Sequence, residues 1–250
     1  MRFRRRVLAF AIGSCALLGA SSAEAQNQSG DSRWVIDLGV GLNPSINGNV
    51  NSGAIGTLQG QTAALLPNSY GDVYGTGIEF RFGGGYELTG NSELRGMFIW
   101  QTADADLVRM GDYGPSSLYG QYSDYKAFGF DFGYRRYMPL STSGFRVYAE
   151  GAIGIADVNR INIQLAAPQS NLVMNNTDFY DGTAAFTWSV GAGVLFPIGK
   201  NVDFNAQLGL HHVGGLSDVD QLVGTGLDTI NNDSARLTFP IIVGVRIRLR

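Results

Sequence analysis

The sequence predicts an all-β protein, an antiparallel up-and-down transmembrane β-barrel of about eight strands. Apolar and polar residues alternate along most of the chain after residue 33, in stretches of about nine to thirteen residues. Short and long connections follow one another in turn between these stretches. A tilted strand needs about 9–11 residues to cross a bilayer, whereas strands of soluble sheets are most often about 5–6 residues long. The strand lengths therefore favour a membrane barrel.

The N-terminus has the three parts of a secretory signal peptide. MRFRRR is basic, VLAFAIGSCALLGA is a short apolar run, and AEA (23–25) precedes a cleavage site. We expect residues 1–25 to be removed, residues 26–33 to form a short N-terminal segment, and residues 34–250 to form the barrel domain. The apolar run is too short for a membrane anchor. IGSC also resembles a lipoprotein cleavage box, but the apolar run continues past it to the better site.

The only cysteine, Cys15, lies within the signal peptide. The mature chain is therefore expected to have no disulfide and no thiol chemistry, although it is exported.

Alternating stretches supply the expected strands, and each has an apolar and a polar face. They cover residues 34–42, 77–87, 94–102, 128–137, 145–155, 186–196, 202–211 and 237–249. In FGFDFGYRRY (128–137), aromatic residues such as Phe130 and Phe132 alternate with Asp131 and Arg135. In a membrane barrel the apolar set faces lipid and the polar set faces the interior.

The connections alternate in length, as they do in outer-membrane barrels with short periplasmic turns and long outer loops. Short turns are expected near residues 88–92, 138–144 and 198–201, and long links near residues 43–73, 103–125, 156–182 and 213–235. RINIQLAA (160–167) alternates again within the third long link. We read it as the fifth strand continuing above the membrane, with Ile161 and Ile163 on the same face as Ile153 and Ile155.

The inward face carries a balanced set of charges. A barrel of about eight strands has room for side chains and little else, so buried charges must be paired. The expected interior network contains Asp37, Glu79, Glu87, Asp131, Glu150, Asp203, Arg81, Arg95, Arg135, Arg146, Arg246 and Arg248. A one-residue register slip would turn these groups into hydrocarbon, at about 2–4 kcal/mol for each base near the midplane.

Aromatic residues at the expected strand ends predict two girdles at the lipid interfaces. Those at the short-turn side are Trp34, Tyr86, Tyr134 and Tyr137. Those toward the long links are Tyr74, Trp100, Tyr125 and Trp188.

The chain resembles the small outer-membrane β-barrels of Gram-negative bacteria, namely the transmembrane domain of outer membrane protein A and the opacity and surface-antigen families. The resemblance covers about residues 34–250 and rests on GTGIEFRFGGGYEL, FGFDFGYRRY, VGVRIRL and the signal peptide. It implies a location in the outer membrane, contact with outer-membrane lipid and lipopolysaccharide, and insertion by the barrel-assembly machinery. Such barrels commonly end in an aromatic residue, whereas this chain ends in Leu249 and Arg250.

Charge and motifs narrow the expected function. The long links are acidic, and no basic patch follows the signal peptide, so we expect no nucleic-acid partner. No EF-hand spacing is present, and we expect neither a metal nor a cofactor. His211 and His212 stand near Ser217 and Asp218, but their spacing matches no known motif of outer-membrane hydrolases.

The leading expectation is a non-enzymatic barrel, with no catalytic residues, that has a structural or surface-interaction role through its four acidic loops and an unidentified extracellular ligand. A small-solute channel is the alternative, and a lipid A-modifying enzyme is a third reading.

Overall fold

The computed structural model describes residues 33–139, 145–219, 224–232 and 234–249. The expected signal peptide, most of the short N-terminal segment and much of the expected turn near residues 138–144 lie outside the described residues. Residues 32–250 form one compact unit. No helix among the described residues is long and apolar enough to cross a membrane.

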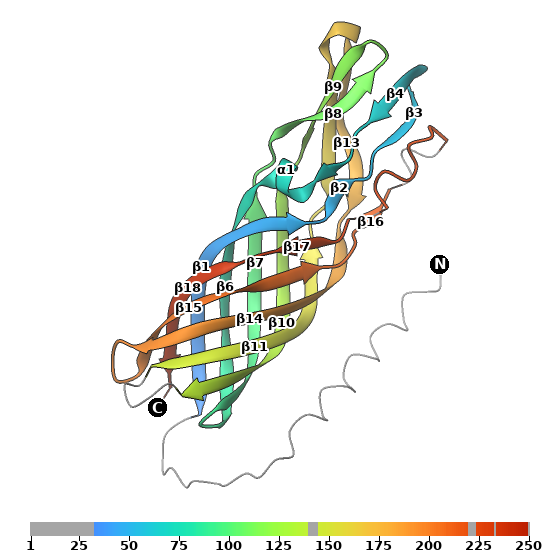
Figure 1. Ribbon diagram of the computed structural model, residues 1–250. Coiled ribbons are helices and arrows are strands. Elements are labelled where there is room, and N and C mark those ends of the chain that lie inside the picture. Colours follow the sequence, from blue (N-terminus) through green and yellow to red (C-terminus); the bar gives the residue numbers. More distant parts are fainter. Residues whose placement is uncertain (1–32, 140–144, 220–223, 233, 250) are drawn as a thin grey trace, which may run out of the picture. The chain divides into compact units, whose positions relative to one another are not determined.

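Within the described residues, eight long strands close an antiparallel barrel, which confirms the predicted fold class (Figure 1). The first seven are β1 (Trp34–Asn47), β6 (Thr76–Thr89), β7 (Ser92–Ala103), β10 (Tyr125–Pro139), β11 (Arg146–Val158), β14 (Thr183–Pro197) and β15 (Val202–Val213). The eighth consists of β17 (Arg236–Thr238) and β18 (Ile241–Arg248). Each strand pairs with the next, and β18 pairs back with β1, where Leu38 lies opposite Val245.

The eighth strand is interrupted at Phe239 and Pro240. Proline has no backbone N–H and cannot donate to the sheet. The chain nevertheless stays attached on both sides, because the Phe239 N–H donates to the Pro44 carbonyl and the Gly209 N–H donates to the Pro240 carbonyl. On the N-terminal side of the interruption, β17 pairs with both β1 and β15.

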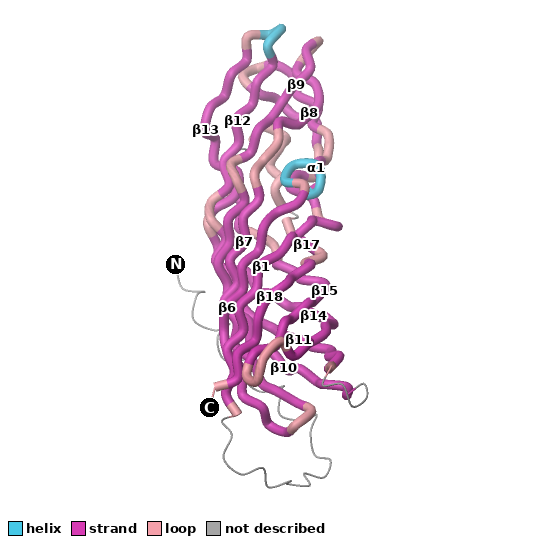
Figure 2. Tube along the Cα trace, turned by 90° about the vertical axis from the view of Figure 1, so that its left-hand side faces the viewer, coloured by secondary structure: helices cyan, strands magenta, loops and turns pink. Residues whose placement is uncertain are grey.

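The long links contain further strands rather than open coil. The first contains β2 (Asn49–Asn51), β3 (Ala54–Leu58), β4 (Gln61–Leu65), β5 (Asn68–Ser69) and α1 (Tyr70–Tyr74). The second and third contain β8 (Leu107–Tyr113), β9 (Ser116–Tyr122), β12 (Ile161–Ala167), η1 (Pro168–Ser170) and β13 (Leu172–Asp181), and the fourth contains β16 (Ser217–Asp218). We call these elements, together with residues 224–232, the extension. Figures 1 and 2 show it projecting beyond one end of the barrel.

The extension is a folded β-structure. Seven of its strands form one sheet in the order β16-β13-β12-β9-β8-β4-β3, and β2 pairs separately with β5. Residues 225–230 of the fourth link lie along the outer edge of the sheet. The Thr57 N–H donates to the Thr225 carbonyl (2.7 Å) and the Ser52 N–H donates to the Ile230 carbonyl (2.8 Å). Leu227 and Ile230 from this segment are buried, so the fourth link covers the edge at β3.

The barrel and the extension have opposite interiors. In the barrel the exposed face is an apolar belt, which includes Leu38, Phe82, Phe98, Phe130 and Val243. In the extension the apolar residues are inside, and Leu118, Tyr122, Ile163 and Phe179 belong to one continuous core. We call the end of the barrel that adjoins the extension its upper end and the short-turn end its lower end. The core begins at the upper end, where Ala127, Val158 and Ala185 join it.

The face predicted for the third long link is wrong. Ile153 and Ile155 of β11 point outward, but Ile161 and Ile163 of β12 are buried. Residues 159–160 belong to no strand, and this break separates the two stretches. Odd-numbered residues therefore face outward in β11 but inward in β12, because an irregular residue pair can reverse which side chains face inward.

The charged barrel interior as the candidate functional site

Arg246 lies at the centre of the lower part of the barrel interior. Its side chain is fully buried, and its Nη2 lies 2.5 Å from Glu93 Oε2 and 2.7 Å from Glu87 Oε1. The Tyr137 hydroxyl accepts a hydrogen bond from Arg246 and donates one to Glu93 (2.7 Å). A buried guanidinium is tolerated when carboxylates and hydrogen bonds compensate its charge. Here both Nη atoms of Arg246 have partners, whereas its Nε has none among the described residues.

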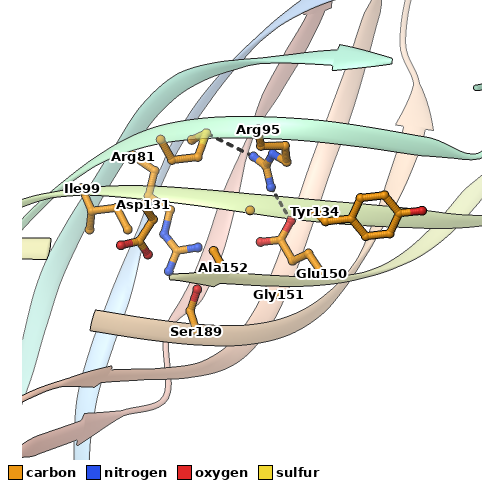
Figure 3. A pocket seen from close by; sticks show the side chains of 11 residues that line it. Arg81, Arg95, Ile99, Asp131, Tyr134, Glu150, Gly151, Ala152 and Ser189 are labelled. Atoms are coloured by element: carbon orange, nitrogen blue, oxygen red, sulfur yellow. Dashed lines mark hydrogen bonds and ion pairs between the residues drawn. The ribbon is translucent and has the colours of Figure 1, made fainter. Parts of the chain in front are cut away.

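A second group of ion pairs occupies the middle of the interior. Arg95 contacts Glu150, Asp37 (3.2 Å) and Glu93 (3.5 Å). Arg135 is fully buried and contacts Glu150 Oε2 through Nε (2.9 Å) and Nη2 (2.8 Å). Figure 3 shows Arg95 of β7 and Glu150 of β11 pointing toward one another, and β10 lies between these two strands in the sheet. Two arginines therefore share one carboxylate.

A third group lies above the second and is built around Asp131. Thr187 donates to Asp131 Oδ1 (2.7 Å), and His211 Nε2 lies 3.8 Å from Asp131 Oδ2. The other ring nitrogen of His211 is 2.9 Å from Gln101 Nε2, which also lies 2.9 Å from Glu79 Oε2. Glu79 also pairs directly with Arg81. The charges of this group are thus joined partly through neutral side chains.

The remaining predicted network residues lie at the short-turn mouth. Arg146 contacts Asp203 (3.3 Å) and Glu87 (3.8 Å), and Arg248 contacts Asp203 (2.9 Å). Arg146 and Glu87 are partly exposed there, whereas Asp203 is buried. The structure thus places every predicted network residue inside the barrel or at this mouth. Asp131 contacts Thr187 and His211, and each of the others contacts at least one other predicted member.

Sequence reasoning missed several interior residues. Glu93 and Arg236 are buried, and each lies one residue before the start of a predicted strand, at residues 94 and 237. A one-residue extension of those strands with the same alternation would have found both. Gly85 explains how Glu93 fits, since a Cβ on this glycine would lie 2.4 Å from the Glu93 carboxylate. Tyr148 lies on the inward face expected for residues 145–155, although it was not counted in the network; it donates to Asn205 (2.8 Å) and lies beneath the Arg135 guanidinium.

The lipid-interface position predicted for Tyr74, Tyr125 and Tyr137 is wrong, because all three are at most 2% exposed. Tyr137 belongs to the lower ion-pair group. Tyr74 and Tyr125 pack with Tyr70 at ring distances of about 6 Å, and the Arg236 guanidinium lies 4.2 Å from the centre of the Tyr125 ring. We call Tyr70, Tyr74, Tyr125 and Arg236 the aromatic layer. An aromatic ring can stabilise a buried cation, which explains the inward position.

The other five predicted girdle residues are exposed or half-buried. Trp34, Trp100 and Tyr134 are 58%, 40% and 43% exposed, and Trp34 contacts the Tyr86 ring edge-on at 5.0 Å. Trp188 stacks against His212 at 5.3 Å. These positions remain predicted interfacial contacts.

Burial affects the phenols of the extension. It raises the pKa of Tyr70, Tyr74 and Tyr122, because an apolar core disfavours the phenolate. Their hydroxyls donate to carbonyl or amide oxygens, at 3.0 Å for Tyr70 to Ser234 and 3.1 Å for Tyr122 to Asn51. These tyrosines therefore remain neutral at ordinary pH.

The space left inside the barrel is small. Two cavities of about 20 and about 10 Å³ lie on either side of Asp131, which lines both. Spaces of this size hold about one water molecule each. Figure 3 shows the side chains around the larger cavity, with Arg81 and Ser189 directed toward it.

The histidines and Ser217 do not form one site. His212 stacks on Trp188, His211 lies among the interior groups, and Ser217 forms a hydrogen bond with Thr183 (3.1 Å). No group of three metal-ligating side chains occurs among the described residues.

Comparison with known proteins gives the family. A family model described as the outer membrane protein beta-barrel domain matches residues 13–239. No curated protein matches the chain.

Among solved structures, the chain is similar to Neisserial surface protein A, with 13% identity, 88% of this chain and 99% of that chain covered, and a TM-score of 0.46. It is similar to the outer membrane protease OmpT of Escherichia coli, with 9% identity, 86% and 96% covered, and a TM-score of 0.44. It is also similar to the attachment invasion locus protein of Yersinia pestis in complex with sucrose octasulfate, with 12% identity, 86% and 99% covered, and a TM-score of 0.35. With the family match over most of its length, the chain belongs to the outer membrane protein beta-barrel domain family.

Proposed function

We propose that this outer-membrane barrel is closed to solutes and that its function lies in holding the folded extension outside the cell. The observation that carries the proposal is the filled interior. From the short-turn mouth upward, side chains of the ion-pair groups and then the aromatic layer occupy the cross-section, and the cavities near Asp131 are only about 10 and about 20 Å³.

Two different barriers support closure. The lower barrier consists of arginine–carboxylate pairs, in which Arg135 and Arg246 are fully buried. The upper barrier is the aromatic layer and the apolar core above it, and Arg236 is the only buried charged side chain there among the described residues. A hydrated ion would have to displace paired charges below and enter an apolar core above, and both steps are costly.

The extension supplies a surface for interaction. On the extension and the adjoining end of the barrel, the outward-facing acids outnumber the exposed bases, and they are Asp72, Asp104, Asp106, Asp112, Asp124, Asp157, Asp218 and Asp228. The exposed bases Arg109, Lys126 and Arg160 each lie within 4 Å of an aspartate. Of the acids on which the acidic-loop expectation rested, Asp220 and Asp233 lie outside the described residues. A partner with a cationic or neutral surface fits this face better than a polyanion does.

Catalysis is not part of the proposal. His212 and Ser217 have separate partners, and the set of Thr187, Asp131 and His211 is sealed inside the barrel, where a lipid or peptide substrate has no access. The mass of lipid A from cells expressing the chain tests this point. A change that disappears in the His212→Ala variant would establish the enzyme reading instead.

Single-channel conductance of the refolded mature chain in a planar bilayer tests closure. We expect silence, or rare small flickers. Large stable steps would show that the chain is a channel and would overturn the proposal.

The two barriers can be tested separately. The double variant R95A/R135A removes the shared partners of Glu150 but leaves the aromatic layer intact, so we expect it to remain silent. Conductance in this variant alone would show that the ion pairs are the only barrier and that the aromatic layer does not seal the barrel.

A further inference from the structure

The exposed charges of the molecule are divided between its two ends. The extension is acidic on its outer face, as described above. At the short-turn end, the exposed or half-buried charged side chains of the described residues are Arg33, Arg136, Arg146, Lys200, Arg248 and one acid, Glu87. The other carboxylates of this end, Asp37, Glu93 and Asp203, are buried in the interior network. The short-turn end therefore presents a positive surface.

Three of these bases have no acidic partner among the described residues. Arg33, Arg136 and Lys200 are exposed, and no ion pair involves them there. Arg248 shares Asp203 with Arg146, so two cations compete for one buried carboxylate. A surface that leaves several cations unpaired has an electrostatic attraction for an anionic partner.

Neighbouring strands bring three of the bases together. The Leu249 N–H donates to the Trp34 carbonyl (2.9 Å), which places Arg33 beside the end of β18. The Arg248 N–H donates to the Asn201 carbonyl (2.8 Å), which places Lys200 on the other side of the same strand end. Arg136 lies elsewhere on the rim, on the outward face of β10 between Tyr134 and Met138.

Apolar side chains surround these cations. Trp34, Ile198 and Leu249 are 58%, 64% and 40% exposed, and Met138 is 49% exposed. Such residues enter the boundary between headgroups and acyl chains, where basic residues also collect. We therefore expect the bases to lie at the depth of lipid phosphates, which favours a lipid headgroup over a soluble polyanion.

We propose that Arg33, Arg136, Lys200 and Arg248 form a basic collar that binds the headgroups of anionic phospholipids in the periplasmic leaflet. Short turns of outer-membrane barrels face the periplasm, so the collar lies in that leaflet. The acidic extension lies at the other end of the barrel, and its negative charge repels anionic lipids. The collar thus favours the orientation in which the basic end of the barrel lies in the periplasmic leaflet, and it anchors the barrel there.

Lipid selectivity measured with spin-labelled lipids tests the collar. The mature chain is refolded in phosphatidylcholine vesicles, and the association of spin-labelled phosphatidylglycerol relative to phosphatidylcholine is measured by electron spin resonance at low and high salt. We expect a preference of about fivefold for the anionic lipid at low salt, decreasing as salt rises. In the triple variant R33Q/R136Q/K200Q the ratio should fall to about one. These side chains are exposed and have no acidic partner in the part of the chain that the structure describes, so the variant is expected to fold normally.

The matched control is R109Q/K126Q/R160Q, which removes the same number of positive charges from the extension and the barrel end next to it, and it should keep the wild-type preference. Heat-modifiable migration on gels checks that both variants are folded. Absence of a preference in the wild-type chain, or an equal loss in the control, would overturn the collar. A soluble polyphosphate that displaces the lipid label equally well from the wild type and the triple variant would also overturn it. None of these results depends on conductance, so failure of the collar and failure of the closed-barrel proposal are distinguishable.

Discussion

The barrel and the extension are made from connected strands, yet polarity is reversed between them. In the barrel Arg135 and Arg246 are fully buried and Phe130 is 40% exposed. In the extension Phe179 is buried and Arg160 is exposed. Lipid surrounds the first region and water the second, so apolar side chains face outward in one and inward in the other. An exposed phenylalanine and a buried arginine are therefore ordinary in the barrel and would be unusual in the extension.

Loss of a buried cation should give the largest difference between the regions. Arg246→Met leaves Glu93 buried without its closest cation, so we expect the free energy of unfolding to fall by about 3–5 kcal/mol. Arg160→Met is the matched substitution in the extension. There the arginine pairs with Asp178 and Asp181 in water, and the cost should stay within about 1 kcal/mol. Urea unfolding in lipid vesicles, followed by tryptophan fluorescence, measures both values, and equal costs would contradict the reversed interiors.

Removal of a phenyl ring should have the opposite pattern. Phe179→Ala opens a cavity in the core of the extension and should cost about 3–5 kcal/mol there. Phe130→Ala removes a ring that contacts lipid and Phe98, so no cavity forms inside the protein. Protease added outside refolded vesicles should cleave the extension of the Phe179→Ala variant and spare its barrel. Cleavage of the Phe130→Ala variant at the same rate would show that the two regions do not unfold separately.

Replacement of an exposed valine by arginine distinguishes a position that faces lipid from one that faces water. Val243 and Val173 are 45% and 63% exposed, and each is replaced by arginine. In the barrel, Val243→Arg should cost about 2–4 kcal/mol, because the position lies in the middle of the apolar belt. In the extension, Val173→Arg should change stability by less than about 0.5 kcal/mol. A neutral result for Val243→Arg would place this part of β18 outside the hydrocarbon.

Alkaline pH should weaken the extension by a smaller amount. The pKa of Tyr70, Tyr74 and Tyr122 is raised in the folded chain, whereas an unfolded tyrosine ionises near pH 10. The neutral phenols thus stabilise the fold fully below about pH 10, and this contribution is lost as the pH rises further. Protease sensitivity of the extension should increase above that pH, together with phenolate absorbance at 295 nm.

Tyr122→Phe provides the control for this pH effect. The variant loses the hydrogen bond to Asn51. It also has one buried ionisable group fewer, so the alkaline transition should become less steep. An unchanged slope would show that ionisation of this tyrosine does not drive the transition.

The sequence by itself determined the eight membrane strands, the face that each turns to lipid and most of the charged residues that face the interior. It could do so because alternation has a period of two in every strand and because charges are too costly in hydrocarbon to face outward. Glu93 and Arg236 were missed only because the expected strand ends were one residue too short. The sequence therefore predicts that acids and bases share one face of the strands, without any knowledge of tertiary contacts.

Only the tertiary structure decided what the long links do. Alternation within β12 is visible, but the break at residues 159–160 reverses its inward face, and no local rule predicts that reversal. Tyr74 and Tyr125 suit a lipid interface by residue type, yet the fold places them under the extension beside Arg236. Burial of these rings depends on segments far apart in the chain, such as α1 and β17. Closure of the barrel brings these segments together.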